Sequence, residues 1–182
     1  MPIKTKDELE RSLKKLLTNK PLSKITIKEL TDDCNVSRMT FYYHFADIYE
    51  LARYVSEKDA MRAEQESEGS IKNHLNKIFD IFYNDKTIIM NIYHSLSREN
   101  AQKYLEKSFK SVIERLVLQV SYGMNISSVD IDFIKCFCIN AVIGITEEWF
   151  DGGMVADGNV ISTKIYNAIN NLVGSYCVKE LI

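Results

Sequence analysis

Apolar residues recur every three or four positions along most of this sequence, while the residues that interrupt helices are scarce. The 182 residues include only two prolines and seven glycines, and no stretch alternates apolar and polar residues in the manner of a half-buried strand. In one segment, Ile71, Leu75 and Phe82 fall on a single face of a helix. We therefore predict an all-α protein.

Start and stop signals divide this pattern into separate helices. Thr5 and Glu8 form a capping box, in which each side chain can bond the other residue's free amide, and Pro21 follows the end of that helix. Thr26 and Glu29 form a second capping box. The helices are predicted to begin at Thr5, Thr26, Ser37 and Asp47, and to continue at about 71–84, 86–96, 98–122, 128–150 and 159–177.

Two short helices near the N-terminus are separated by a tight turn. The first ends near Cys34, and Asn35 tolerates the left-handed conformation that a tight helix exit requires. Only Val36 intervenes before Ser37, which is a good N-cap for the second helix. Val36 and Phe41 are expected to pack inward. This arrangement is the helix-turn-helix pattern.

The chain is expected to form two domains joined by a helix. The helix-turn-helix domain is predicted at residues 1–46, a connecting helix at 47–66, and a larger helical bundle at 67–182. Residues 1–45 contain nine Lys or Arg against six Asp or Glu, whereas the remainder contains fourteen against nineteen. An excess of positive charge at one end of the chain favours contact with a polyanion.

The segment SRMTFYYHF covers the second short helix and holds most of the chemistry. Arg38 can bond guanine O6 and N7 in the major groove. Tyr42, Tyr43 and His44 carry donors that suit phosphate oxygens. The alternatives are that the tyrosines are buried between the domains, that His44 packs against Phe45, and that Arg38 is a solvated surface residue.

A set of residues at fixed spacing surrounds this segment: Thr26, Ile27, Leu30, Val36, Ser37, Thr40, Phe41, Tyr42, His44, Phe45 and Leu51. The pattern, within residues 4–55, resembles the DNA-binding domain of TetR-family transcriptional regulators. With that resemblance, base contacts are expected from Arg38, Met39 and Thr40, and phosphate contacts from Lys24, Thr26, Ser37, Tyr42, Tyr43 and His44.

Two residues depart from the family pattern. Ile48 stands where a lysine is usual, so one phosphate contact is expected to be lost, and Met39 replaces the usual small residue. The resemblance also implies a homodimer on a roughly palindromic double-stranded DNA operator, controlled by an effector that binds the C-terminal domain. The effector is either a small molecule or a partner protein.

The C-terminal region holds a second, shorter resemblance. Gly144, Trp149 and Gly153 form a GxxxxWxxxG segment similar to that of regulators related to the dihydroxyacetone-kinase operon activator. Aromatic and sulfur side chains in this region could line an effector pocket, although a plain core is the alternative for most of them. The pocket candidates are Phe82, Met90, Tyr93, His94, Phe137 and Trp149.

The predicted helix at 128–150 is apolar on nearly all of its faces. Thirteen of the twenty residues from Ile131 to Phe150 are Ile, Val, Phe, Trp, Ala or Cys. Such a helix must be covered all round, either as a central helix within the chain or by the core on one side and a partner chain on another. Candidates for a dimer interface are Phe133, Phe137, Ile145, Ile165 and Ile169.

Several classes of protein are not supported by the sequence. The four cysteines form no CxxC pair and have no histidine at metal-ligand spacing, so no metal or other cofactor is expected. An enzyme is not expected either, because no nucleophile–base pair and no glycine-rich phosphate loop occurs. The chain has no apolar run long enough for a signal peptide or a membrane span, which favours a cytoplasmic protein.

Overall fold

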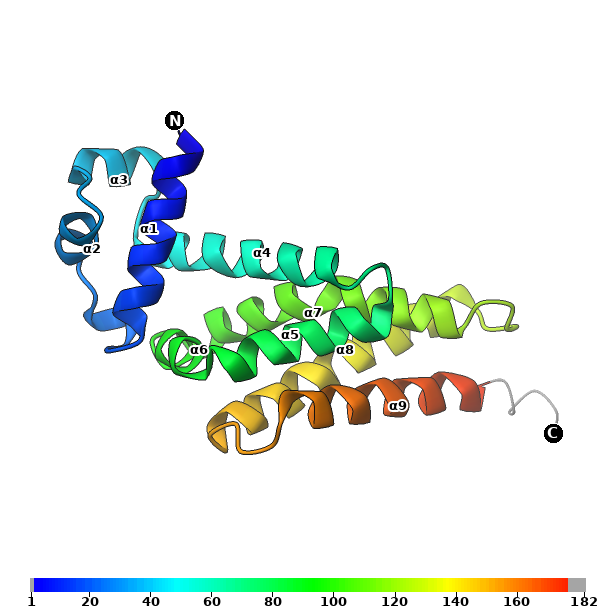
Figure 1. Cartoon of the computed structure of the whole chain (residues 1–182). Coiled ribbons are helices and arrows are strands. Elements are labelled where there is room, and N and C mark those ends of the chain that lie inside the picture. The colour runs from blue at the N-terminus through cyan, green and yellow to red at the C-terminus, as the bar shows by residue number, and fades with distance from the viewer. Residues whose placement is uncertain (1, 177–182) are drawn as a thin grey trace. The chain divides into compact units, whose positions relative to one another are not determined.

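The structure is a computed structural model that describes the backbone of residues 2–176 and the side chains of residues 4–176. Over this range it consists of nine α-helices and one short 3₁₀ helix, with no strand (Figure 1). The prediction of an all-α fold is confirmed.

The chain forms two compact units. Unit 1 comprises Met1–Asp59 and Asp85–Ala101, and unit 2 comprises Ala60–Asn84 and Gln102–Ile182. Unit 1 contains α1 (Pro2–Leu17), η1 (Leu22–Lys24), α2 (Ile27–Asp33), α3 (Arg38–His44), the first part of α4 (Ile48–Glu66) and α6 (Lys86–Tyr93). Unit 2 contains the end of α4, α5 (Ile71–Asn84), most of α7 (Arg98–Val120), α8 (Ser128–Asp151) and α9 (Gly158–Tyr176).

Unit 1 is built on a leucine stripe of α1. Leu9, Leu13 and Leu17 recur at every fourth position and are fully buried in one apolar cluster with Phe41 of α3 and Leu51 of α4. Because one cluster takes side chains from α1, α3 and α4, the short helices α2 and α3 do not have to be stable alone.

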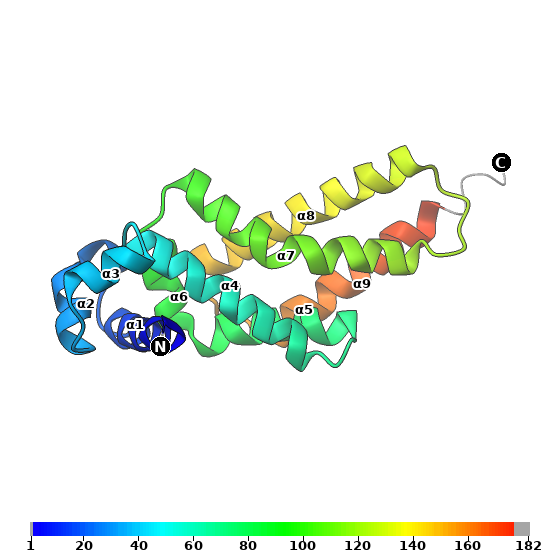
Figure 2. The same cartoon turned by 90° about the horizontal axis from the view of Figure 1, so that it is seen from above.

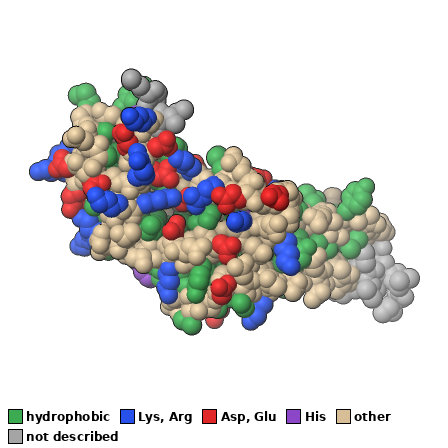
Figure 3. Space-filling view, viewed as in Figure 1, with side chains coloured by type: hydrophobic (Ala, Val, Ile, Leu, Met, Phe, Trp, Pro, Cys, Tyr) green, Lys and Arg blue, Asp and Glu red, His purple; other side chains and the backbone are tan. Residues whose placement is uncertain are grey.

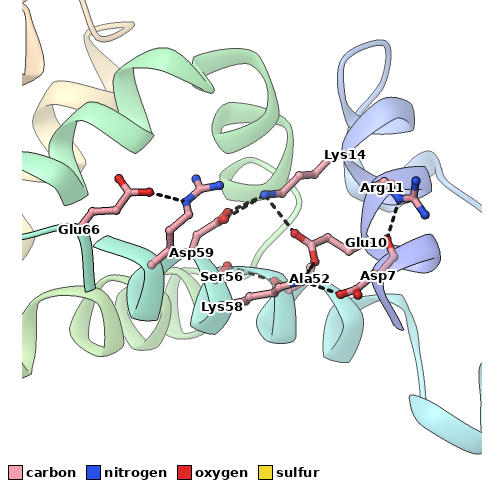
Figure 4. Close-up of polar contacts among 10 residues, drawn as sticks. Asp7, Glu10, Arg11, Lys14, Ala52, Ser56, Lys58, Asp59 and Glu66 are labelled. Atoms are coloured by element: carbon pink, nitrogen blue, oxygen red, sulfur yellow. Dashed lines mark hydrogen bonds and ion pairs between the residues drawn. The ribbon is translucent and has the colours of Figure 1, made fainter. Parts of the chain in front are cut away.

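Ion pairs also connect α1 with α4. The Lys14 ammonium lies 2.9 Å from Asp59, and the Lys58 ammonium lies 2.7 Å from Asp7 and 2.6 Å from Glu10 (Figure 4). These two carboxylates raise the pKa of Lys58 above its usual value. The pairs are partly exposed, so we expect them to fix the register of the two helices more than to stabilise the fold.

Helix α6 belongs to unit 1 although it follows α5 in the sequence. Asn91 donates a hydrogen bond of 2.7 Å to the carbonyl of Leu17, at the end of α1, and the backbone N–H of Ser23 donates to Ser95 Oγ at 3.1 Å. Ile92 is buried in the apolar cluster of unit 1. The predicted division at residues 46 and 66 therefore differs from the structure, because these contacts join residues more than seventy positions apart.

Most helix positions agree with the prediction, and the differences lie at the ends. The first helix begins at Pro2 instead of Thr5, which is a correction; proline is favoured at a first helical position because its φ is already set for a helix. Helix α4 begins directly after Asp47, whose carboxylate accepts a hydrogen bond of 2.8 Å from the backbone N–H of Glu50. Helices α6 and α7 end at Tyr93 and Val120, a few residues before their predicted ends at 96 and 122.

The core of unit 2 is aromatic. The ring of Phe79 lies 5.3 Å from Phe109 and 5.5 Å from Trp149, measured between ring centres, and Phe82 lies 5.4 Å from Phe150. These rings come from α5, α7 and α8, so they join three helices in one cluster.

The GxxxxWxxxG segment ends α8 and shapes the connection to α9. Gly153 has a φ of 73°, which favours glycine, and its backbone N–H donates to the carbonyl of Phe150 at 2.8 Å. The indole N–H of Trp149 donates to the carbonyl of Ala156 at 2.9 Å. The next helix, α9, begins at Gly158, where a Cβ would lie only 2.7 Å from the carbonyl oxygen of Phe79. Gly158, which follows the motif, therefore allows the start of α9 to approach α5 closely.

Helix α8 is not covered all round within the chain. Its buried residues include Ile134, Val142 and Phe150, whereas Phe133 and Phe137 on another face have 61% and 53% of their surface exposed. The alternative of a central helix that this chain covers completely is therefore wrong for the described residues. No helix among the described residues is long and apolar enough to span a membrane.

Candidate DNA-binding site and effector region

Helices α2 and α3 form the predicted helix-turn-helix of unit 1. Helix α2 carries the predicted capping box between Thr26 and Glu29. Asn35 has a φ of 59°, and the backbone N–H of Val36 donates to the carbonyl of Thr31 at 3.0 Å. Ser37 then caps α3. The turn is therefore as tight as the sequence predicts, and the left-handed residue is the expected asparagine.

The side chains of α3 divide into an inward and an outward set. Phe41 is fully buried and Phe45 is 4% exposed, so both belong to the core of unit 1. Met39 and Tyr43 are each 83% exposed, and Tyr42 is 58% exposed. The alternative that the two tyrosines are buried between the domains is wrong. The helix presents its outward residues to solvent, and hydrophobic side chains reach the surface over α3 (Figure 3).

Arg38 and His44 differ in their exposure and in their contacts within the chain. Arg38 is exposed, and its guanidinium makes no hydrogen bond or ion pair with the described residues. His44 is half-buried, with its ring 5.0 Å from that of Tyr43 and 6.3 Å from that of Phe45. Arg38 is therefore available to an external acceptor, whereas the His44 ring also packs within α3, as the alternative reading expected.

Three of the predicted DNA contacts already take part in helix caps. The hydroxyl of Thr26 accepts from the backbone N–H of Glu29 at 3.2 Å and donates to its carboxylate at 2.9 Å. The hydroxyl of Ser37 accepts from the backbone N–H of Thr40 at 3.0 Å and lies 2.8 Å from the Thr40 hydroxyl. These hydroxyls position the starts of α2 and α3, and only their remaining lone pairs or protons are left for another partner.

A carboxylate stands beside the start of α2. Glu29 pairs with Lys20 at 2.6 Å, and this hydrogen bond, together with those from the backbone and hydroxyl of Thr26, lowers its pKa to about 2. Lys20 is thus engaged within the chain. Lys24 is exposed close by, and Lys28, an exposed residue of α2 that the sequence interpretation did not single out, adds a second lysine. The sequence signal that could have identified Lys28 is its position in the first turn of α2, two residues after the N-cap Thr26.

The burial of Ile48 accounts for an isoleucine at the position where the family pattern has a lysine. Its side chain is 8% exposed and belongs to the apolar cluster of unit 1. A lysine there would have to extend its charge out of that cluster. The residue packs the first turn of α4 onto the core instead.

The six pocket candidates are divided between the two units. Phe82 and Trp149 lie in the aromatic core of unit 2, Phe137 is exposed on α8, and the other three lie in or directly after α6 of unit 1. The pocket assignment therefore stays a prediction. A helical apolar pattern marks residues that are buried, but it does not distinguish a filled core from a cavity.

A groove lies elsewhere in unit 2, between α7 and α8, two helices that cross in the view of Figure 2. Its volume is about 480 Å³, and no predicted pocket residue lines it. Ile139 and Ile143 contribute apolar surface, and charged side chains of both signs line the rest, among them Glu106, Lys110 and Lys135. Its size suits a small ligand, whereas its charged walls are more polar than those of most ligand pockets.

The interface candidates fall into two groups. Phe133, Phe137 and Ile145 are exposed on α8, and the rings of the two phenylalanines lie 6.4 Å apart. Ile165 and Ile169 of α9 have only 4% and 5% of their surface exposed, because α9 packs that face against α5. The structure corrects their assignment: they belong to the core of unit 2. We refer to Phe133, Phe137 and Ile145 as the α8 stripe.

One polar group is buried without a partner. His74 of α5 is 4% exposed, and its Nδ1 atom has no hydrogen-bond partner among the described residues. Burial lowers its pKa below the ordinary value, while the nearby Glu64 carboxylate acts in the opposite direction. Glu64 itself pairs with Arg115 at 2.8 Å. No group of three or more potential metal ligands occurs among the described residues.

Comparison with known proteins agrees with this architecture. Residues 69–171, more than half of the chain, match the TetR-type family model described as "Transcriptional regulator C-terminal region". No curated protein matches the chain.

Solved structures share the fold over nearly the whole chain. The dihydroxyacetone kinase operon activator DhaS aligns with a TM-score of 0.72 at 18% identity, covering 96% of this chain and 97% of its own. A transcriptional regulator of the TerR/AcrR family from Aquifex aeolicus VF5 aligns with a TM-score of 0.58 at 16% identity, covering 92% and 99%. A putative TetR-family regulator from Vibrio parahaemolyticus gives 0.52 at 17% identity, covering 89% and 96%.

The family and its structural neighbours are transcriptional regulators and not enzymes. The N-terminal helix-turn-helix, the C-terminal helical unit and the match over residues 69–171 lead to one conclusion. This chain belongs to the TetR family of transcriptional regulators.

Proposed function

We propose that unit 1 binds double-stranded DNA and that α3 is the helix that enters the major groove. The observation that carries this proposal is the division of α3, with Phe41 and Phe45 in the core and Arg38, Met39 and Tyr43 exposed together. A helix in a groove needs such an outward face, with a free donor that can reach base edges. The Arg38 guanidinium supplies that donor.

Phosphate contacts would fix the position of α3 in the groove. Tyr42 and Tyr43 carry exposed hydroxyls, and His44 carries a partly exposed imidazole. Lys24 and Lys28 offer ammonium groups on the side of α2. The remaining predicted contacts, Thr26, Ser37 and Thr40, would act through hydroxyls that also hold the helix caps.

We also propose that the protein is a homodimer and that the α8 stripe forms part of its interface. Phe133, Phe137 and Ile145 expose apolar surface that a second copy would cover. Gly144, exposed next to Ile145, has no side chain and no neighbouring atom within 4 Å of a Cβ position, so it leaves room for a partner helix. A two-fold dimer would place two α3 helices on half-sites about one helical turn apart, which predicts a roughly palindromic operator.

We propose that unit 2 controls DNA binding. We propose that an effector binds there and favours one spacing of the two DNA-binding units over another, since only a difference in affinity between two states can shift their populations. The groove between α7 and α8 is the candidate site for a small molecule.

A partner protein is the second candidate effector. The charged groove walls, with Glu106, Lys110 and Lys135 at the surface, favour this alternative because they suit the polar rim of a protein interface. Purification of the untagged protein from its native host, followed by mass measurement of the intact complex, distinguishes the two. A stoichiometric second chain supports a protein effector, and a small added mass supports a ligand.

Selection of bound sequences from a random pool of double-stranded DNA tests DNA binding and the symmetry together. We expect enrichment of a sequence with inverted half-sites. If no sequence is enriched over the starting pool, the proposed function is wrong. Enrichment of a single half-site without its inverted copy would contradict the two-fold dimer alone.

A further inference from the structure

The two most exposed hydrophobic side chains of α3 lie one helical turn apart. Met39 and Tyr43 are both 83% exposed, and residues separated by four positions are neighbours on a helix surface. Both exceed Tyr42, at 58% exposed, and they lie on the outward side, away from the buried Phe41. If α3 enters the major groove as proposed above, the Met39 side chain, next to Arg38 at the start of the helix, faces the base edges.

Met39 cannot read a base through ordinary hydrogen bonds. Its thioether has no donor and is only a weak acceptor, so it cannot replace the water that hydrates polar base edges. Arg38, the preceding residue, has the opposite character, with five donors that suit guanine O6 and N7. An exposed methionine beside it would gain only from an apolar group on the DNA.

Only one such group occurs in the major groove of unmodified DNA. Thymine presents its C5-methyl group there, whereas the edges of the other three bases present hydrogen-bonding atoms. Contact with this methyl removes apolar surface of both partners from water, which is favourable in proportion to the area buried.

We propose that Met39 is a specificity-determining residue that selects thymine through its C5-methyl group. The thioether packs on the methyl, and the Tyr43 ring on the same face of α3 shields the contact from water. This inference rests on the proposed DNA binding by α3, and it assigns a base to the position where the family pattern has a small residue.

Thr40 is the other residue near the start of α3 that carries a methyl group. It is half-buried, and its hydroxyl lies 2.8 Å from that of Ser37 within the helix cap. This contact restricts the side chain to the N-terminal end of α3. Met39, with its long, unbranched and exposed side chain, is better able to follow a methyl group on the groove floor.

The test uses the operator obtained by selection from the random pool and replaces each thymine in turn by deoxyuridine. This replacement removes only the C5-methyl group and leaves base pairing unchanged. Binding of the full-length protein is measured by fluorescence anisotropy. One thymine in each half-site is expected to matter, with about a fourfold loss of affinity per methyl group removed.

Variants of Met39 link that loss to the residue. Met39→Ala shortens the side chain and Met39→Gln keeps its length but makes its end polar; both are expected to bind the thymine and deoxyuridine operators equally. Met61→Ala is the matched control, because Met61 is also an exposed methionine, 63% exposed, and lies on α4 outside α3. It is expected to retain the fourfold difference.

The outcomes separate this inference from the function on which it depends. If the wild-type protein selects an operator and no thymine responds to deoxyuridine, the thymine contact is wrong and DNA binding stands. If replacing one thymine weakens binding of the wild-type protein, and the Met39 variants lose as much affinity from the same replacement, another residue reads the methyl group. The inference is then also wrong. If no operator is selected, the proposed function itself fails.

Discussion

Two adjacent rings in α3 have different surroundings because a helix turns by about 100° per residue. Phe41 is fully buried and contacts Tyr42 edge to face, with the ring centres 5.5 Å apart. Tyr42 lies on the exposed side, where its hydroxyl needs no partner within the chain. At the scale of the residue, a side chain's position on the helix determines whether it supports the fold or is available to an external partner.

Gly158 is a position where a single methyl group should be costly. A Cβ would lie 2.7 Å from the carbonyl oxygen of Phe79, and backbone atoms cannot move aside cheaply. We expect Gly158→Ala to lower the free energy of unfolding by about 1–3 kcal/mol, measured by chemical denaturation. Gly174→Ala in the same helix is the control, since a Cβ there meets nothing within 4 Å, and it should be neutral or stabilising. Equal effects of the two changes would contradict the close approach of α9 to α5.

His74 should make the stability of the protein sensitive to mild acid. Its folded pKa lies below the ordinary value of 6.5 because burial disfavours the charged ring. Below pH 6.5 the unfolded chain therefore binds the proton more readily, and the stability falls as the pH drops towards the folded pKa.

The free energy of unfolding measured between pH 7.5 and about pH 5 tests this expectation. His74→Leu should reduce the fall in this range, because it removes the buried titratable group. His94→Leu, at an exposed histidine, should leave the fall unchanged. A His74→Leu protein with the same pH dependence as wild type would show that other groups cause it.

At the scale of the element, periodicity and capping residues predicted most helices well. The capping box of Thr26 and Glu29, the N-cap at Ser37 and the range 71–84 all agree with the structure. What the sequence could not predict depends on contacts between distant residues. The pattern of α9 shows that Ile165 and Ile169 are apolar, but not that α5 is the helix that covers them.

For the candidate site as well, the sequence predicts what depends on one helix but not what depends on contacts between helices. The outward set of α3 could be predicted because one short helix with two anchoring phenylalanines fixes it. The effector region could not, since a groove depends on where α7 and α8 leave space between them. Glu106 and Lys135 carry no local signal that they would face the same groove.

The α8 stripe leads to a prediction about assembly. Phe137→Glu places a charge in the proposed interface, and we expect dimer dissociation to be favoured by about 2 kcal/mol, roughly thirtyfold in the dissociation constant. Sedimentation equilibrium measures this directly. Tyr122→Glu makes a similar change at a residue that is 90% exposed and outside the stripe, and it should leave the dimer intact. An unchanged dimer with Phe137→Glu would exclude the stripe as the interface.

At the scale of the whole molecule, the two units do not follow the order of the sequence, because unit 1 is built from two separate stretches of the chain. Helix α6 lies between two helices of unit 2 in the chain, yet Asn91 bonds the end of α1 and Ile92 enters the core of unit 1. The chain therefore crosses between the units three times, within α4, after α5 and within α7. A structural change in unit 2 would therefore have three covalent routes to unit 1.

The central claim is that α3 reads DNA, and the affinity of Arg38→Ala for the selected operator and for an unrelated duplex tests it most directly. Fluorescence anisotropy at one fixed salt concentration measures both. The account predicts a loss of about 1–3 kcal/mol on the operator, with little change on unrelated DNA. Tyr42→Phe should weaken both complexes equally, and Arg62→Ala on α4 should affect neither. Unchanged operator binding by Arg38→Ala, or an equal loss on both duplexes, would contradict base reading by this helix.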